Sequence, residues 1–247
     1  MDELLATARR KFDAGDVVAA LEPARRALAE AEPDSPQAAN VHVALSAIHE
    51  RLSRHDEAEH HARQAVALTD MPPHGRLRVH ALASLAVMAR IRGRLDEAEG
   101  LYLSALALAE EDIASLLCGL GIVHKSAHRY DDAERVYREA LALIGPDEPA
   151  AAAVWHNLGG IEHSRGRHAE GEPHARRSVT LRERALGPDH PTVAADRAAL
   201  ASLLVGQRRF DEAKELYRQA LAVFRRVYPA DHHDVAVTTR NLAALEH

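Results

Sequence analysis

Small residues recur at regular places between charged and bulky ones along this chain of 247 residues. Pairs of alanines lie seven residues apart at 98 and 105, at 133 and 140, and at 213 and 220. Residues with this spacing lie on one face of an α-helix, where a small side chain lets a neighbouring helix approach closely. The pattern therefore predicts a chain of helices packed side by side.

Each of these pairs belongs to a longer sequence motif. The motif is Asp-Glu-Ala or Asp-Asp-Ala, with a tyrosine four residues after the alanine. Clear copies occupy Gly93–Leu106, His128–Leu141 and Arg208–Leu221, and weaker ones centre on Ala20, Ala58 and Gly171. The six anchor positions (20, 58, 98, 133, 171 and 213) lie 35 to 42 residues apart. A period of this length indicates stacked copies of one supersecondary unit.

This motif resembles the start of the second helix in a tetratricopeptide repeat. In that family each repeat has two antiparallel helices, A and B, and helix A carries a bulky residue followed by Leu-Gly or Leu-Ala. Leu117 with Leu120-Gly121 and Trp155 with Leu158-Gly159 match this motif, whereas the first repeat departs most, with Thr7-Ala8. The resemblance covers essentially the whole chain. It implies an all-α, right-handed superhelical solenoid without strands.

We expect one solenoid domain over residues 1–247, with thirteen helices in six repeats and a C-terminal capping helix. The expected repeats are 2–34, 36–70, 76–110, 112–146, 149–187 and 191–229, and the final helix is 234–246. Segments rich in proline and glycine at 33–36, 71–75 and 145–149 separate neighbouring repeats. Proline ends a helix because it lacks the amide donor and restricts the residue before it.

The last third of the chain has a narrower resemblance. The segments 186–194 and 228–236 end two repeats with Gly-Pro-Asp-His-Pro and with Pro-Ala-Asp-His-His. They are similar to the connections in kinesin light chains and many bacterial relatives. The segments Asn157-Leu158-Gly159 and Asn241-Leu242-Ala243 match the opening of helix A in those proteins.

Composition excludes several classes of protein. The chain is 47% hydrophobic but only 4% aromatic, so its core must be built from alanine, leucine and valine. No apolar run approaches the roughly 20 residues of a membrane span, and a single cysteine, Cys118, excludes an internal disulfide framework. The net charge of -6 argues against general nucleic-acid binding, which depends on phosphate neutralisation. We expect a cytoplasmic, bacterial protein without a membrane or nucleic-acid partner.

Seventeen histidines raise the question of a metal site. A zinc site needs three or four converging ligands, and pairs such as His156 with His163 supply two. His190 and His232 occupy the connecting turns of the resemblance, His124 fills a packing position, and the other histidines are interpreted as solvated surface. Cys118 is interpreted as a packing residue, and no phosphate loop or nucleophile motif is present. We therefore expect no catalytic residues, no metal and no cofactor.

The resemblance implies that the A helices line a concave groove. Its expected polar residues combine cations, histidines and amides, which suit an extended peptide of acidic character. They are Asn40, Arg51, His80, Arg90, Lys125, His156, Asn157, His163, Arg240 and Asn241. The Lys and Asn pattern of chaperone-binding members does not appear.

Two functions remain open at this point. The first is a non-enzymatic scaffold or adaptor that binds a protein or peptide. For this function, the groove residues favour binding over a purely structural spacer. The second is a sensor or assembly module of a larger regulatory protein. Leu245-Glu246-His247 could also be a remnant of a purification tag, and the sequence does not define an oligomeric state.

Overall fold

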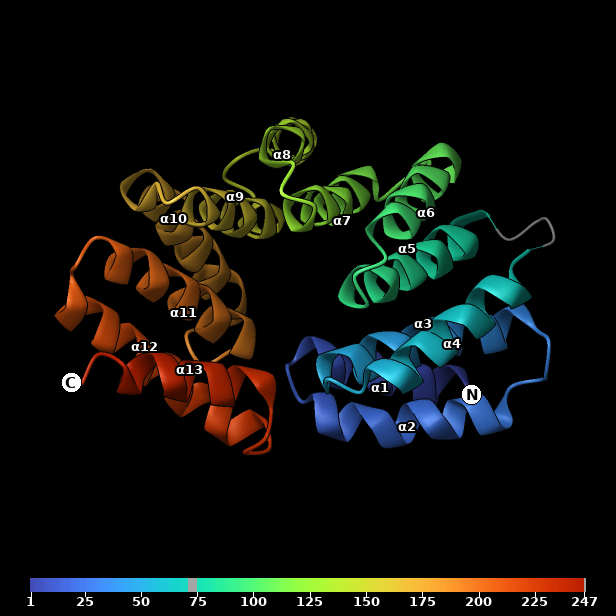
Figure 1. The fold of residues 1–247 in the computed structure, drawn as a ribbon. Helices are drawn as coiled ribbons and strands as arrows, with labels where there is room; N and C mark the ends of the chain where they lie inside the picture. The colour runs from blue at the N-terminus through green and yellow to red at the C-terminus, as the bar shows by residue number, and fades with distance from the viewer. Residues whose placement is uncertain (71–74, 247) are drawn as a thin grey trace. The chain divides into compact units, whose positions relative to one another are not determined.

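The computed structural model describes residues 1–70 and 75–246, and within these ranges it contains α-helices, one 3-10 turn and no strand (Figure 1). The all-α prediction is confirmed. The predicted connector at 71–74 and the terminal His247 lie outside the described residues. Thirteen α-helices occur in the described ranges, as the repeat pattern predicts.

The helices divide into two compact units, Met1–Arg129 (unit 1) and Tyr130–His247 (unit 2). Unit 1 contains α1 (Asp2–Asp13), α2 (Val17–Glu30), α3 (Pro36–Arg51), α4 (His55–Leu68), α5 (Gly75–Ile91), α6 (Leu95–Leu108) and α7 (Ile113–Ser126). Unit 2 contains α8 (Tyr130–Ile144), the 3-10 turn Pro149–Ala151, α9 (Ala152–Ser164), α10 (His168–Leu186), α11 (Pro191–Gly206), α12 (Phe210–Val227) and α13 (His233–Ala243). The boundary falls between the two helices of the expected fourth repeat, so a single domain over 1–247 stays a prediction.

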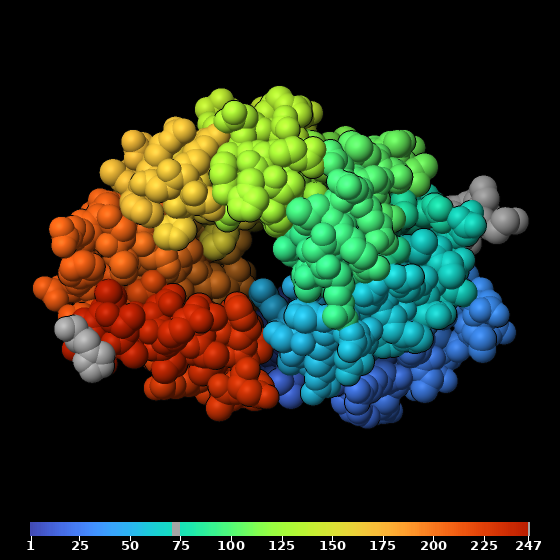
Figure 2. All heavy atoms as spheres, viewed as in Figure 1, coloured from blue at the N-terminus to red at the C-terminus, as the bar shows by residue number. Residues whose placement is uncertain are grey.

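Each unit is a stack of helix pairs. In unit 1, α1 packs on α2, α3 on α4 and α5 on α6, while α3 also contacts α1 and α5. In unit 2, α9 packs on α10 and α11 on α12, and α11 also contacts α9. Within each unit, repeats that are adjacent in sequence are adjacent on the surface (Figure 2). This is the packing of a helical solenoid; the handedness of the superhelix stays a prediction.

The turn between the two helices of a repeat is the same in all six repeats. Five residues before each anchor, the backbone is left-handed: Gly15, Ser53, Gly93, His128, Gly166 and Arg208 have φ between 59° and 83°. The next residue donates its N–H to a carbonyl five residues earlier, as from Arg94 to Ala89 and from Arg209 to Leu204, both at 2.9 Å. This bond closes the C-terminus of helix A in a Schellman motif. Three of the six positions lack glycine, so the helix pairing itself holds the turn.

The anchor positions lie on the buried face of helix B. Ala98, Ala133 and Ala213 are fully buried, as predicted. Gly171 takes this place in the fifth repeat because α9 lies very close. A Cβ added at Gly171 would lie 3.1 Å from the carbonyl oxygen of Gly159 and 2.8 Å from Cδ2 of Leu203. The close approach therefore explains why this anchor is glycine.

A row of ion pairs connects neighbouring repeats, and we call it the Glu–Arg ladder. In each rung, the glutamate directly after an anchor contacts an arginine near the start of helix B in the next repeat. The rungs are Glu59–Arg94 at 2.6 Å, Glu99–Arg129 at 2.6 Å, Glu134–Arg165 at 2.9 Å and Glu172–Arg209 at 2.7 Å. Two rungs lie in each unit, so the ladder is a common feature of both.

None of the described helices is long and apolar enough to cross a membrane.

Candidate functional site

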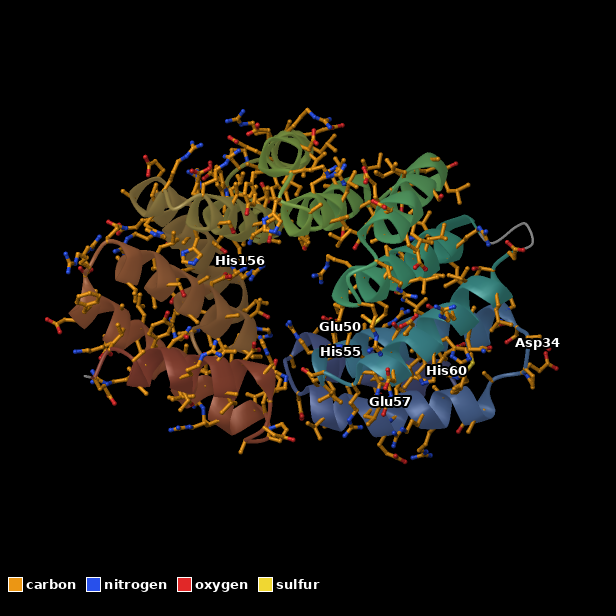
Figure 3. The ribbon with its side chains drawn as sticks, in the orientation of Figure 1. Asp34, Glu50, His55, Glu57, His60 and His156 are labelled. Atoms are coloured by element: carbon orange, nitrogen blue, oxygen red, sulfur yellow. The ribbon has the colours of Figure 1, made fainter. Side chains whose placement is uncertain are left out.

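In unit 1 the predicted groove residues all lie on A helices. Asn40 and Arg51 belong to α3, His80 and Arg90 to α5, and Lys125 to α7, and all five are partly buried. We call the surface formed by α1, α3, α5 and α7 the A-face of unit 1. Figure 3 shows Glu50 on this unit near His55, at the end of α3 and the start of α4, far from Asp34.

Two adjoining hollows open on this A-face. The first, of about 240 Å³, lies between α1 and α3 and is mostly apolar; its lining residues are Ala8, Arg9, Phe12, Asp13, Val43, Ala44, Ala47 and Ile48. The second, of about 540 Å³, combines polar and apolar groups and is lined by Arg9, Pro36, Gln37, Asn40, Arg76, Leu77 and His80. Arg9 borders both and donates a hydrogen bond to Oδ1 of Asn40 at 2.7 Å. An apolar group and a polar group of one ligand could therefore occupy neighbouring positions.

The predicted cations of the A-face have different surroundings. His80 contacts Oδ2 of Asp112 at 3.1 Å, so an acid of the same unit already occupies one side of its ring. The side chains of Arg90 and Lys125, in contrast, make no ion pair or hydrogen bond with any other residue that the structure describes. Burial lowers the pKa of Lys125, and the neighbouring charge of Arg90 lowers it further. The side chains of α5 and α7 thus bring together two cations that form no ion pair with a described residue.

Cys118 does not have the environment of a nucleophile. Burial raises the pKa of its thiol to about 11, so the uncharged thiol predominates at neutral pH. Because the thiolate is the reactive form, this agrees with its interpretation as a packing residue.

In unit 2 the predicted residues lie on α9 and α13, and one of them joins a buried polar network. Nδ1 of His156 lies 2.7 Å from Oδ1 of Asp196, a carboxylate of α11 that is only 1% exposed. Arg182 donates to the same oxygen at 2.9 Å, and Oγ of Ser178 lies 2.7 Å from the other. We call these four residues the Asp196 network; Figure 3 labels His156, which belongs to α9.

The other predicted residues of unit 2 lie outside this network. Asn157 is partly buried on α9, and His163 is exposed near the end of that helix, with its ring centroid 5.1 Å from that of His168. Arg240 is exposed on α13. Asn241 lines a hollow of about 170 Å³ between α11, α12 and α13. Asn157 and Asn241 therefore stay candidates for contact with a ligand backbone.

The interpretation of most histidines as solvated surface was wrong for part of repeat 2. His49 of α3 is 2% exposed, and His42 and His61 are partly buried between α3 and α4. The ring centroid of His61 lies 5.0 Å from that of His42, 5.5 Å from that of His49 and 5.3 Å from that of His60. These four residues, the repeat 2 histidine cluster, face one another because α3 and α4 pack along their length.

Other histidines lie where the sequence predicts them. His124 is buried, and His190 and His232 precede α11 and α13 as N-caps, each accepting a hydrogen bond on Nδ1 from an N–H two residues later. Within the described ranges, no group of three or more His, Cys, Asp or Glu side chains is arranged to hold a metal ion.

Comparison with known proteins decides the family. The sequence profile of the tetratricopeptide repeat matches residues 78–144, 150–226 and 194–247. The chain belongs to the tetratricopeptide repeat family. A comparison with curated protein sequences gave no significant match.

Solved structures of tetratricopeptide repeat and related proteins share the fold at low sequence identity. A Rap protein complexed with competence and sporulation factor has a TM-score of 0.70 and 18% identity, over 98% of this chain and 73% of that one. A thermophilic tetratricopeptide repeat protein of Thermus thermophilus gives 0.65 and 19%, over 84% and 98%. BtubC (BKLC) from P. vanneervenii gives 0.59 and 20%, over 91% of each chain. The narrower kinesin-light-chain type stays a prediction.

Proposed function

We propose that this protein is a non-enzymatic, cytoplasmic scaffold or adaptor that binds a protein or peptide on the faces of its A helices. The observation that carries the proposal is the pair of adjoining hollows on the A-face of unit 1. One is apolar around Phe12, Val43 and Ala47, and the other adds polar groups from Asn40 and His80. Binding sites commonly combine an apolar surface with a few fixed polar groups.

The family supports this proposal in general terms. Tetratricopeptide repeat proteins are typically interaction scaffolds, and the Rap structure is that of a complex. The polar groups of the A-face include the amide of Asn40, which can both donate to and accept from a peptide backbone.

Photocrosslinking from the A-face tests the proposal. A photoreactive amino acid at Ala47 would line the apolar hollow, whereas the same group at Leu103, an exposed residue of helix B α6, serves as the matched control. In lysate of the source organism we expect a discrete crosslinked partner from position 47 and none from position 103. Crosslinks from position 103 alone would locate binding on the helix B surface and contradict the proposal.

The alternative is a sensor or assembly module of a larger regulatory protein. One comparison favours it: the match covers 98% of this chain but 73% of the Rap chain, which therefore has a part that this chain does not match. The crosslink from position 47 also distinguishes the two functions. A crosslink to another part of the same, longer polypeptide would favour the regulatory module over the scaffold.

A further inference from the structure

The ring of Tyr102 is buried, and its hydroxyl reaches the surface without a hydrogen-bond partner in the described part of the chain. Tyr102 belongs to α6 and is 4% exposed. The equivalent tyrosine of the sixth repeat, Tyr217, lies 2.9 Å from the hydroxyl of Ser202. Val87 takes the place of Ser202 in the third repeat and offers no polar atom. Tyr102 therefore lacks the internal partner that its counterpart has.

The position of this hydroxyl is fixed against α7. A Cβ built at Gly119 would lie 2.4 Å from the hydroxyl oxygen of Tyr102, so only glycine leaves room for the phenol end of the ring. Gly119 directly follows Cys118 and lies six residues before Lys125. The hydroxyl is thus held beside the helix that carries Lys125.

Arg90 and Lys125 are equivalent residues of neighbouring repeats. Each follows the leucine of the Leu-Ala or Leu-Gly motif, Leu85 or Leu120, by five residues, and α5 contacts α7. Neither cation has a carboxylate partner among the described residues, whereas Arg94, just after α5, is paired with Glu59. A partly buried cation without a counter-ion is unfavourable. An external anion between the two would remove this cost.

The cations and the hydroxyl influence one another electrostatically. Burial raises the pKa of Tyr102 to about 12, and the charge of Arg90 opposes that rise. Arg90 also acts on Lys125, as described above. Arg90 of α5 therefore lies near both Tyr102 of α6 and Lys125 of α7, in line with the packing of α5 on α6 and on α7.

We propose that Arg90, Lys125 and the Tyr102 hydroxyl form a subsite for one carboxylate side chain of a bound protein or peptide. This subsite rests on the proposed function and specifies the chemistry of its ligand. Arginine, lysine and a phenol hydroxyl are all donors, and charge-assisted hydrogen bonds to a carboxylate are the stronger kind.

Glu50 of α3 limits the charge that the subsite accepts. Its carboxylate acts on Tyr102 in the sense opposite to Arg90 and makes no ion pair with any described residue. Two cations beside one fixed anion suit a single carboxylate better than a dense polyanion. A ligand with a basic or amide group next to its acidic residue would satisfy Glu50 as well.

The lysines of the chain provide a direct probe. Lys11, Lys125 and Lys214 are its three lysines, so reductive methylation with a ¹³C label gives few NMR signals. With hexaglutamate as the ligand, we expect the midpoint of the Lys125 titration to move to higher pH, because a bound carboxylate stabilises the ammonium. Lys214, which lies 4.0 Å from Asp211, serves as the internal reference and should not move. Hexaglutamine should leave all three signals unchanged.

Variants then assign the contacts. Arg90→Gln and Tyr102→Phe should each weaken hexaglutamate binding by about tenfold, the size expected for a hydrogen bond to a charged group. The matched control Arg135→Gln removes an exposed arginine of unit 2 and should change affinity less than twofold. Glu50→Gln should strengthen binding severalfold, a gain that general damage to the fold would not produce.

The outcomes separate this subsite from the wider proposal. If Lys125 does not respond to hexaglutamate, or if Arg90→Gln and Tyr102→Phe bind as the unmodified protein does, the subsite is overturned. An equal response of Lys125 to inorganic phosphate at the same concentration would overturn its assignment to a peptide carboxylate. In either case a partner crosslinked from Ala47 would leave the proposed function intact.

Discussion

Both units contain histidines that pack between helices, but the residues in contact with these histidines differ in charge. In unit 1, His61 lies between α3 and α4 among His42, His49 and His60. In unit 2, His156 of α9 lies against the buried carboxylate of Asp196. The first environment contains other imidazoles and the second contains an acid.

The electrostatic consequence is clearest in unit 1. The pKa of His61 is lowered to about 4, most of all by burial and also by the rings of His42, His49 and His60 and the charge of Arg25. Burial lowers the pKa of His49 too; Glu57 opposes this shift, while Arg25 and Arg54 reinforce it. Burial therefore favours the neutral form of His42, His49 and His61, and a neutral imidazole can pack in a helix contact. The residue on the facing helix therefore decides whether a histidine packs against other rings or contacts a carboxylate.

The largest effect is expected from removing the acid in unit 2. Asp196→Ala leaves Arg182 without its buried counter-charge and His156 without its carboxylate partner, and breaking a buried pair in this way typically costs about 3–5 kcal/mol. We expect such a loss in the free energy of unfolding of the full chain in urea. The control is Asp189→Ala, which removes an exposed acid that contacts Arg226 at 2.6 Å. A loss for Asp196→Ala no larger than that of the control would show that the network adds no stability.

The second prediction concerns pH and unit 1. Because the folded state binds a proton on His61 only near pH 4, against the ordinary 6.5, the unfolded state is protonated first. The contribution of His61 to the free energy of unfolding should be fully present above pH 6.5. It should be lost as the pH drops from 6.5 towards 4, by up to about 3 kcal/mol. Thermal unfolding at several pH values across this window measures the decline.

A variant assigns this pH dependence to the cluster. His61→Phe keeps a ring in the contact but cannot gain a proton, so its stability should decline less between pH 6.5 and 4. His163→Phe, at an exposed position of unit 2, should decline as the unmodified protein does. Parallel curves for His61→Phe and the unmodified protein would exclude the cluster as the cause.

The fold could be predicted from sequence because its determinants are local and repeated. Ala98, Ala133 and Ala213 mark the helix contacts, and the residues five positions earlier mark the turns. Counting from the same anchor positions also predicts which helix faces carry Arg90 and Lys125. A period of 35 to 42 residues thus suffices to place each residue on helix A or helix B.

The contacts of the candidate site could not be predicted in this way. Asp196 is 40 positions from His156, and an acid on helix A looks like a solvated residue until α9 and α10 are placed against it. The same holds for Asp112 at His80 and for the absence of a partner at Tyr102, which depends on Val87 and Gly119. Such pairings depend on which side chains face each other across repeats, and the repeat pattern contains no information about them.

The smallest effect is expected from the feature that the two units share, the Glu–Arg ladder. In unit 2, Arg165 is the more enclosed partner, with a side chain 10% exposed, and its hydrogen bond holds the pKa of Glu134 below its ordinary value. In unit 1, the rung Glu59–Arg94 has an arginine side chain that is 35% exposed. Solvent screens exposed pairs, so we expect double-mutant cycles to give about 1 kcal/mol for the first rung and about 0.3 kcal/mol for the second.

These cycles use Gln for Glu and Met for Arg, with unfolding measured at pH 7 and again at high salt. The coupling should shrink in salt for the exposed rung more than for the enclosed one, since salt screens solvent-exposed charges most strongly. Because the folded-state pKa of Glu134 is lowered, its coupling should be present above pH 4.5 and disappear as the pH falls below that value. Equal couplings in both units would mean that burial does not set the strength of the ladder, and that the difference between the units is confined to their histidines.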